Sequence, residues 1–183
     1  TDKRNGLRTF SCRKLSVATD PREIQIHKAL RKLKLMNTNS HTKHVPQTYL
    51  NASPEDRLSL LQGLMDTDGT VDTDGRVSFS SCSKELAEAV QHLARSLGGR
   101  ATMTCSRHKE GEEYHWGVYI QAGSKFIPFR LSRKVARVRN YQHDTLWRRI
   151  VSIRSLPPEE TVCIKISHPL GLFITRDFVV THN

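Results

Sequence analysis

At 183 residues the sequence can form one domain or two small ones, and without a bilayer-length apolar run or an opening secretory signal we expect it to be cytoplasmic, with no membrane partner. Four cysteines, none in a Cys-x-x-Cys pair, argue against a zinc site or a disulfide framework. The 29 Lys and Arg residues outnumber the 18 Asp and Glu residues, and the formal charge of +11 favours a nucleic-acid partner held through its phosphates.

The N-terminal part of the chain divides into two segments. Residues 1–20 are polar and lack periodicity, which predicts a linker or an exposed loop. From Pro21 to Leu35 apolar residues recur at helical spacing, which predicts a helix.

The next predicted helix begins near Ser53 and ends in an acidic run. Ser53 is a favoured N-cap residue, and Pro54 suits the first helical position. Leucines at helical spacing give one apolar face, and Gly63 lets a second helix approach closely. The helix ends at Asp66-Thr67-Asp68-Gly69, so its carboxylates emerge at the C-terminal end. An ordinary helix with an acidic turn is the alternative interpretation.

Strands and a helix alternate after this point. Asp72-Thr73-Asp74-Gly75 between two strand-like stretches predicts a hairpin. Ser83 to Leu97 is amphipathic and predicts a helix with Ser83 as its N-cap. Two further strands are predicted at residues 100–107 and 114–121, with a final helix after them. The order is therefore helix, two strands, helix, two strands and helix.

Polar side chains alternate along these predicted strands. A twisted antiparallel ribbon fits the major groove of DNA, so these side chains are candidates for groove contacts. A solvated sheet face is the alternative. The candidates are Ser78, Ser80, Thr102, Thr104, Ser106, His115 and Tyr119.

A basic segment follows the last of these strands. We expect Arg133, Arg137 and Arg139 to contact backbone phosphates of DNA. The DNA-binding candidates of the segment are Arg130, Arg133, Lys134, Arg137 and Arg139.

The tail of the chain has a β-rich pattern and a distinctive end. Strands are predicted at Arg148–Arg154, Thr161–Ile166, Leu170–Thr175 and Asp177–Val180. The last two residues are His182 and Asn183. An asparagine amide can attack its own backbone carbonyl, form a succinimide and cut the chain after itself when a neighbouring imidazole assists. A frayed end without chemistry is the alternative.

Two of these segments carry a family resemblance. Leu61–Gly69 resembles the nine-residue LAGLIDADG motif of homing endonucleases, and Lys43-His44-Val45-Pro46 resembles the Lys-x-Ile-Pro block that precedes the second such helix in intein endonucleases. The resemblance implies that two such helices pack together and place one acid from each at the bottom of a DNA-binding saddle, where a divalent metal binds.

The resemblance also implies roles for individual residues. Asp68 would bind the metal with the backbone carbonyl of Thr67, and Asp66 would be a structural acid at the helix end. Hard oxygen ligands suit Mg²⁺. Lys43 and Lys134 would be catalytic, Lys43 by stabilising charge on the phosphodiester and Lys134 by lying close to the scissile phosphate.

The tail resembles the two C-terminal splicing blocks of inteins. Cys163 stands where most members carry aspartate. In a minority class a cysteine at this position attacks the upstream splice junction directly, and Thr181 matches a threonine of that class. The resemblance implies that Cys163, Thr181, His182 and Asn183 are catalytic in splicing, although the standard mechanism stays open. A structural cysteine in the core is the alternative for Cys163.

Taken together, the sequence predicts an α+β fold, in which a LAGLIDADG αββαββα subdomain at 21–145 is followed at 146–183 by the C-terminal β-strands of an all-β Hint splicing domain. We expect the C-terminal part of a larger intein, because no N-terminal splicing block and no first LAGLIDADG helix are recognised. Its expected partners are an N-terminal intein segment, the flanking host-protein exteins and a double-stranded DNA target.

The implied function is self-excision by protein splicing, which needs no cofactor, combined with Mg²⁺-dependent cleavage of DNA at a specific site. A splicing element whose endonuclease region is an inactive relic is the main alternative. A hedgehog-type autoprocessing domain is a weaker one.

Overall fold

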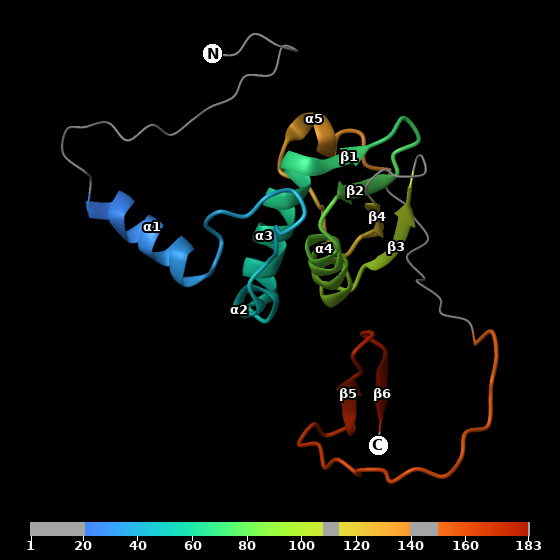
Figure 1. Cartoon of the computed structure of the whole chain (residues 1–183). Helices are drawn as coiled ribbons and strands as arrows, with labels where there is room; N and C mark the ends of the chain where they lie inside the picture. The colour runs from blue at the N-terminus through green and yellow to red at the C-terminus, as the bar shows by residue number, and fades with distance from the viewer. Residues whose placement is uncertain (1–20, 108–113, 140–149, 183) are drawn as a thin grey trace. The chain divides into compact units, whose positions relative to one another are not determined.

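The computed structural model describes residues 21–107, 114–139 and 150–182 (Figure 1). The chain separates into two compact units, Thr1–Asn37 and Thr38–Asn183. Within the first unit, α1 spans Pro21–Lys32 and confirms the helix predicted there. It ends earlier than predicted because Lys34 takes a left-handed φ of 57°, which stops the helical hydrogen-bond pattern.

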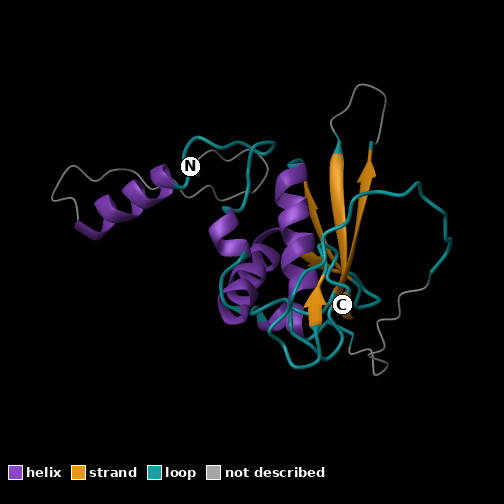
Figure 2. Cartoon of the chain, turned by 90° about the horizontal axis from the view of Figure 1, so that it is seen from below, coloured by secondary structure: helices purple, strands orange, loops and turns teal. Residues whose placement is uncertain are grey.

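The second unit contains a four-stranded antiparallel sheet with two long helices on one of its faces (Figures 1 and 2). The strand order is β1-β2-β4-β3. The strands are β1 (Gly69–Val71), β2 (Val77–Ser81), β3 (Arg100–Ser106) and β4 (His115–Gln121). The helices are α2 (Gln47–Leu50), α3 (Pro54–Asp68), α4 (Lys84–Ser96) and α5 (Ser132–Val135). From α3 to α5 the elements follow the predicted αββαββα order, so the α+β fold class is confirmed.

Local sequence signals set the limits of these elements. The Ser53 hydroxyl accepts a hydrogen bond from the Asp56 N–H at 3.2 Å and begins α3. The Ser83 hydroxyl accepts one from the Leu86 N–H at 3.1 Å and begins α4. Gly75 completes the β1–β2 turn with a φ of 78°, a conformation that glycine adopts without steric cost. These caps and this turn were all predicted.

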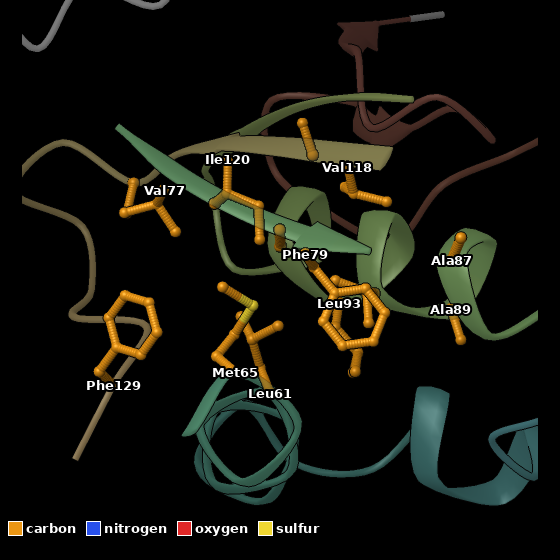
Figure 3. Packing of buried hydrophobic residues seen from close by; sticks show 14 of the residues in the cluster. Leu61, Met65, Val77, Phe79, Ala87, Ala89, Leu93, Val118, Ile120 and Phe129 are labelled. Atoms are coloured by element: carbon orange, nitrogen blue, oxygen red, sulfur yellow. The ribbon is translucent and has the colours of Figure 1, made fainter. Parts of the chain in front are cut away.

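The hydrophobic core lies between the sheet and the two long helices (Figure 3). Leu61 and Met65 of α3 and Leu93 of α4 have no exposed surface, and they pack with Phe79 of β2 and Val118 of β4. Burial of each such side chain contributes about 1.5–3 kcal/mol to folding. The core therefore holds the C-terminal end of α3 rigidly beside the sheet.

The tail differs from its prediction. Its described strands are β5 (Leu172–Ile174) and β6 (Val180–His182), which form a two-stranded hairpin. The strand predicted at Thr161–Ile166 is wrong, as is the described part of the one predicted at Arg148–Arg154, since residues 150–169 form no strand; residues 148–149 lie outside the described residues. A strand needs a partner for its backbone hydrogen bonds, and none of the described residues supplies one here.

The strand predicted at Asp177–Val180 is also displaced. Phe178 has a φ of 56° and lies in the turn, because its N–H donates to the Thr175 carbonyl at 2.9 Å. The strand therefore begins only at Val180.

Candidate functional site

The acidic end of α3 passes directly into the sheet. The helix ends at Asp68, whose side chain is exposed, and Gly69 begins β1. A β-carbon added at Gly69 would lie 2.5 Å from the Met65 carbonyl oxygen, so only glycine fits at this junction. The junction therefore presents the Asp68 carboxylate at the boundary between helix and sheet.

Asp66 faces another part of the structure. Its two carboxylate oxygens accept hydrogen bonds from the Arg130 N–H, each at 3.2 Å, and one of them also accepts from the Leu131 N–H at 3.2 Å. The carboxylate thus fastens the segment before α5 to the end of α3, which is a structural role.

The loop that carries Lys43 is also held in place. The Lys43 N–H donates to the Asn39 carbonyl at 3.1 Å, and the Ser83 hydroxyl donates to the Lys43 carbonyl at 2.6 Å. Val45 is buried in the core two residues later. The backbone at Lys43 is therefore fixed to the start of α4, while the Lys43 side chain is exposed.

Asp68 and Lys43 line one pocket of about 200 Å³. The two residues are twenty-five positions apart in the chain, and the fold brings both to the lining of the same pocket. The lining also contains Cys82 and His115, whose Sγ and Nδ1 atoms lie 3.7 Å apart. Sequence analysis missed Cys82 as a pocket residue, because its position follows from the pairing of Ser81, the last residue of β2, with Trp116 of β4, which places the residue after β2 beside His115. The complete lining is Ser40, Lys43, Asp68, Ser80, Ser81, Cys82, Leu86 and His115.

The predicted groove-contact residues share one face of the sheet. Tyr119 of β4 is paired with Ser78 of β2 and with Thr102 of β3, and paired residues point to the same side. Tyr119 is 52% exposed, whereas its neighbours Val118 and Ile120 point into the core. We call this surface the polar sheet face; it comprises Ser78, Ser80, Thr102, Thr104, Ser106, His115 and Tyr119.

The predicted basic residues do not all lie together. Arg133 and Arg137 line a pocket of about 260 Å³ with Thr70 and Lys134. Arg139 lines another, of about 240 Å³, with Tyr119 and Arg76. Sequence analysis missed Arg76, although its place directly after the predicted β1–β2 turn could have indicated it.

Arg130 is turned toward α3. Its guanidinium donates to the Gln62 side-chain oxygen at 2.8 Å and to the Ser59 hydroxyl at 2.9 Å. These contacts within the protein occupy donors that the predicted contact with DNA would also use.

Lys134 differs most from its prediction. Only 9% of the residue is exposed, and its ammonium donates to the carbonyl oxygens of Met65, Asp66 and Gly69. Burial lowers the pKa of Lys134, Arg133 lowers it further, and the Asp66 and Asp68 carboxylates oppose the shift. The side chain thus points to the end of α3 and not outward, where a phosphate would bind.

The predicted splicing residues lie in or near the C-terminal hairpin. Thr181 and His182 belong to β6, where they pair with Phe173 and Leu172. Cys163 is exposed, so the alternative of a core cysteine is wrong for the described structure. Asn183 lies outside the described residues.

The donor atoms at the end of α3 fit a hard divalent cation. Asp68 offers carboxylate oxygens and Thr67 a carbonyl oxygen, the ligand type that Mg²⁺ takes in proteins. Within the described ranges, no three His, Cys, Asp or Glu side chains gather in a way that could hold a metal.

Comparison with known proteins places this chain in a family. Residues 55–156, more than half of the chain, match the LAGLIDADG-like domain. Over 147 residues the chain is 33% identical to a protein named replicative DNA helicase DnaB from Mycobacterium intracellulare; the match covers 77% of this chain but only 26% of that protein. None of the helices in the described residues combines the length and apolar character needed to cross a membrane. The chain belongs to the LAGLIDADG-like family, a family of nucleases that act on DNA and generally use divalent metal.

Proposed function

We propose that this chain is the C-terminal part of an intein whose LAGLIDADG region cleaves double-stranded DNA at a specific site. The observation that carries the nuclease proposal is the pocket shared by Asp68 and Lys43. It combines a carboxylate for a cation with an ammonium for a phosphodiester, next to Ser80 and His115 of the polar sheet face. Cytoplasmic residence remains part of the proposal.

The polar sheet face would bind the DNA. Its side chains are short hydroxyls, an imidazole and a phenol, which can donate to and accept from base edges in the major groove. Arg133, Arg137 and Arg139 line pockets next to the sheet and would contact phosphates there. The formal charge of +11 makes such binding strongly dependent on salt.

Asp68 and the Thr67 carbonyl would hold Mg²⁺. When bound, the ion would polarise the scissile phosphodiester as a Lewis acid. Lys43, fixed through its backbone to Ser83, would stabilise negative charge on the phosphate. The second acid of the site would come from a second LAGLIDADG helix.

One face of α3 is suited to receive that helix. A β-carbon added at Gly63 would meet nothing within 4 Å. Leu60 and Leu64, which flank this face, are partly buried, so neither is fully covered by the described residues. A helix of the same kind could pack closely on this surface.

The intein part of the proposal rests on the tail and on a relative. Thr181 and His182 lie in a β-hairpin directly before Asn183, the order that cyclisation of the asparagine needs. The chain is similar to about a quarter of a protein named as a helicase, which fits a segment embedded in a host protein. Cys163 would attack the upstream junction, and an N-terminal intein segment and two exteins would be the partners.

The nuclease is tested by Asp68→Asn in the full-length protein that contains this chain. We expect cleavage of the insertion-site DNA in Mg²⁺ to fall on the order of a hundredfold or more, because a neutral amide is a poor ligand for a hard cation. Asp74→Asn is the matched control, since Asp74 is an exposed acid in the β1–β2 turn. Equal cleavage by the Asp68 variant and the unaltered protein would favour the relic alternative.

Splicing is tested separately in a precursor with both exteins. Cys163→Ala should abolish cleavage at the upstream junction, and Asn183→Ala should abolish cleavage at the downstream one. Cys105→Ala is the matched control, because Cys105 is an exposed cysteine of β3. Unaltered formation of the branched intermediate in the Cys163 variant would exclude that residue as the nucleophile.

A further inference from the structure

Lys134 makes the densest set of contacts at the end of α3. Its Nζ atom lies 2.8 Å from the Met65 carbonyl oxygen, 2.8 Å from that of Asp66 and 2.6 Å from that of Gly69. An ammonium has three hydrogens and no acceptor, so these three carbonyls use all of its donors. A side chain bound in this way has no donor left for a phosphate.

Hydrogen bonds run in both directions between the end of α3 and the segment that contains α5. Lys134 belongs to the single turn of α5 and donates into the end of α3, while the Asp66 carboxylate accepts the N–H groups of Arg130 and Leu131 just before α5. Asp66 therefore takes part through its backbone carbonyl and through its side chain. A four-residue helix has little stability of its own, so these bonds hold it in place.

Helix electrostatics favour this arrangement. The carbonyls at the end of a helix carry a partial negative charge that a cation stabilises, and those of Met65 and Asp66 lie there, although the Met65 carbonyl also accepts the Gly69 N–H. Phe129, which is 2% exposed, lies with its ring centroid 5.3 Å from the ammonium and adds a cation–π contact. The charge is thus buried among groups that compensate for the loss of water.

The choice of carbonyls has a consequence for Thr67. The three acceptors belong to Met65, Asp66 and Gly69, so the ammonium lies beside Thr67 and Asp68 without binding the Thr67 carbonyl. The proposed metal ligands of this chain are the Thr67 carbonyl and the Asp68 carboxylate. The backbone on both sides of these ligands is therefore anchored, while the ligands themselves stay available.

We propose that Lys134 is a positioning residue, which clamps the end of α3 so that the Thr67 and Asp68 oxygens hold a fixed geometry for a divalent cation. This inference rests on the proposed nuclease function. It replaces the expectation that Lys134 acts at the scissile phosphate. Lysine is specific for the task, because a planar guanidinium cannot direct three hydrogens at three convergent carbonyls.

The first experiment measures access to the amine and needs no activity. The full-length protein is treated with limiting acetic anhydride at pH 8, with and without target DNA, and acetylation is quantified by mass spectrometry. We expect Lys134 to react at least about tenfold more slowly than Lys43, which is exposed, and to be unaffected by DNA. Reaction of Lys134 as fast as that of Lys43 would overturn the clamp, and protection of Lys134 by DNA would assign it to the DNA interface instead.

The second experiment compares Lys134→Arg and Lys134→Met in single-turnover cleavage and in DNA binding. Both variants should lose about tenfold or more in cleavage rate and require more Mg²⁺ for half-maximal rate, with the DNA dissociation constant within about twofold. Arg133→Ala is the matched control, since Arg133 is the exposed neighbour, and it should weaken DNA binding instead. Normal cleavage by Lys134→Arg would mean that positive charge alone suffices, and would overturn the proposal even where Lys134→Met does not fold.

The two experiments separate this inference from the function on which it rests. If the unaltered protein does not cleave DNA although Lys134 resists acetylation, the nuclease proposal fails and the role of Lys134 in the reaction fails with it. If the protein cleaves DNA but Lys134 is fully reactive, the nuclease stands and the clamp alone is overturned.

Discussion

The LAGLIDADG region and the C-terminal tail differ in whether their apolar side chains are buried. Between α3 and α5 the apolar side chains meet one another, so that Leu61, Val90 and Leu93 are fully buried. In the tail Leu170 is 71% exposed and Val162 is 87% exposed, and the only described strands are the short pair β5 and β6. One region thus finds its partners within the chain, whereas the other carries strand-forming sequence whose partners the described residues do not contain.

This contrast shows how far a residue pattern can be interpreted by itself. Alternating apolar residues indicate that a segment can form a strand, but a strand also needs a neighbour for its backbone groups. In the sheet β2 has neighbours on both sides, β1 and β4. Thr161–Ile166 has no such neighbouring strand among the described residues and forms no strand.

Limited trypsin digestion should give the largest difference between the two regions. Cleavage after Arg154 and Lys165 in the tail should be on the order of a thousandfold faster than cleavage after Arg95 in α4, because the latter requires unfolding of the core. Mass spectrometry of timed samples measures the rates, and digestion in urea provides the control in which they converge. Early cleavage after Arg95 would show that the core is less stable than its packing indicates.

Truncation of one buried and one exposed leucine to alanine compares the stability contributions of the core and of the segment after it. Leu93→Ala should lower the free energy of unfolding by about 2–5 kcal/mol, because it leaves a cavity beside Phe79. Leu156→Ala should change it by less than about 0.5 kcal/mol, because Leu156 is 62% exposed. Urea denaturation followed by circular dichroism measures both. A large effect at Leu156 would mean that this residue also packs on the core, as Phe178 packs on His92.

Two glycines with left-handed backbones provide a smaller test. A β-carbon at Gly75 would lie 2.6 Å from the Arg139 Cβ and 2.8 Å from its N atom, so Gly75→Ala should cost about 1–3 kcal/mol. Gly171 also has a positive φ, of 62°, but a β-carbon there would meet nothing within 4 Å. Gly171→Ala should leave the unfolding midpoint of the core unchanged. Equal shifts of the two midpoints in thermal denaturation would contradict this difference between the two glycines.

The smallest expected effect is a pH dependence confined to the folded region. Partial burial lowers the pKa of His92 below 6.5, and Arg57 lowers it further, while a hydrogen bond with the Leu50 backbone opposes the shift. The unfolded chain therefore takes up the proton first as pH falls below 6.5, so stability should fall between 6.5 and the folded-state pKa and level off below it. His92→Gln should reduce this slope in urea denaturation at pH 5 to 7. An identical slope in both proteins would assign it to other groups.

Much of the fold could be predicted from the sequence because its signals are local. Ser53 and Ser83 cap the helices that follow them, and Gly75 fits its turn, since each acts within a few residues. The polar sheet face was also predictable, because alternation along a strand sorts side chains by face.

Contacts between segments that are distant in the sequence were harder to predict. Only the resemblance to LAGLIDADG endonucleases suggested that Asp68 and Lys43 belong to one site, and no cap, turn or periodicity signal predicts the pocket that they share. Lys134 looked like one more residue of a basic surface, and its direction depends on a fold that brings α5 to the end of α3. Arg130 was also predicted to contact DNA, and its contacts with Gln62 and Ser59 of α3 likewise depend on how distant segments come together.

The alternation of side chains along β2, β3 and β4 has an evolutionary consequence. The exposed hydroxyls that would read DNA project from the opposite side of the sheet to the residues that keep it folded, while Lys43 is held by the Ser83 hydroxyl and Lys134 by backbone carbonyls. Mutations at Thr102, Thr104 or Tyr119 could therefore accumulate and redirect the protein to a new insertion sequence while its cutting chemistry is retained.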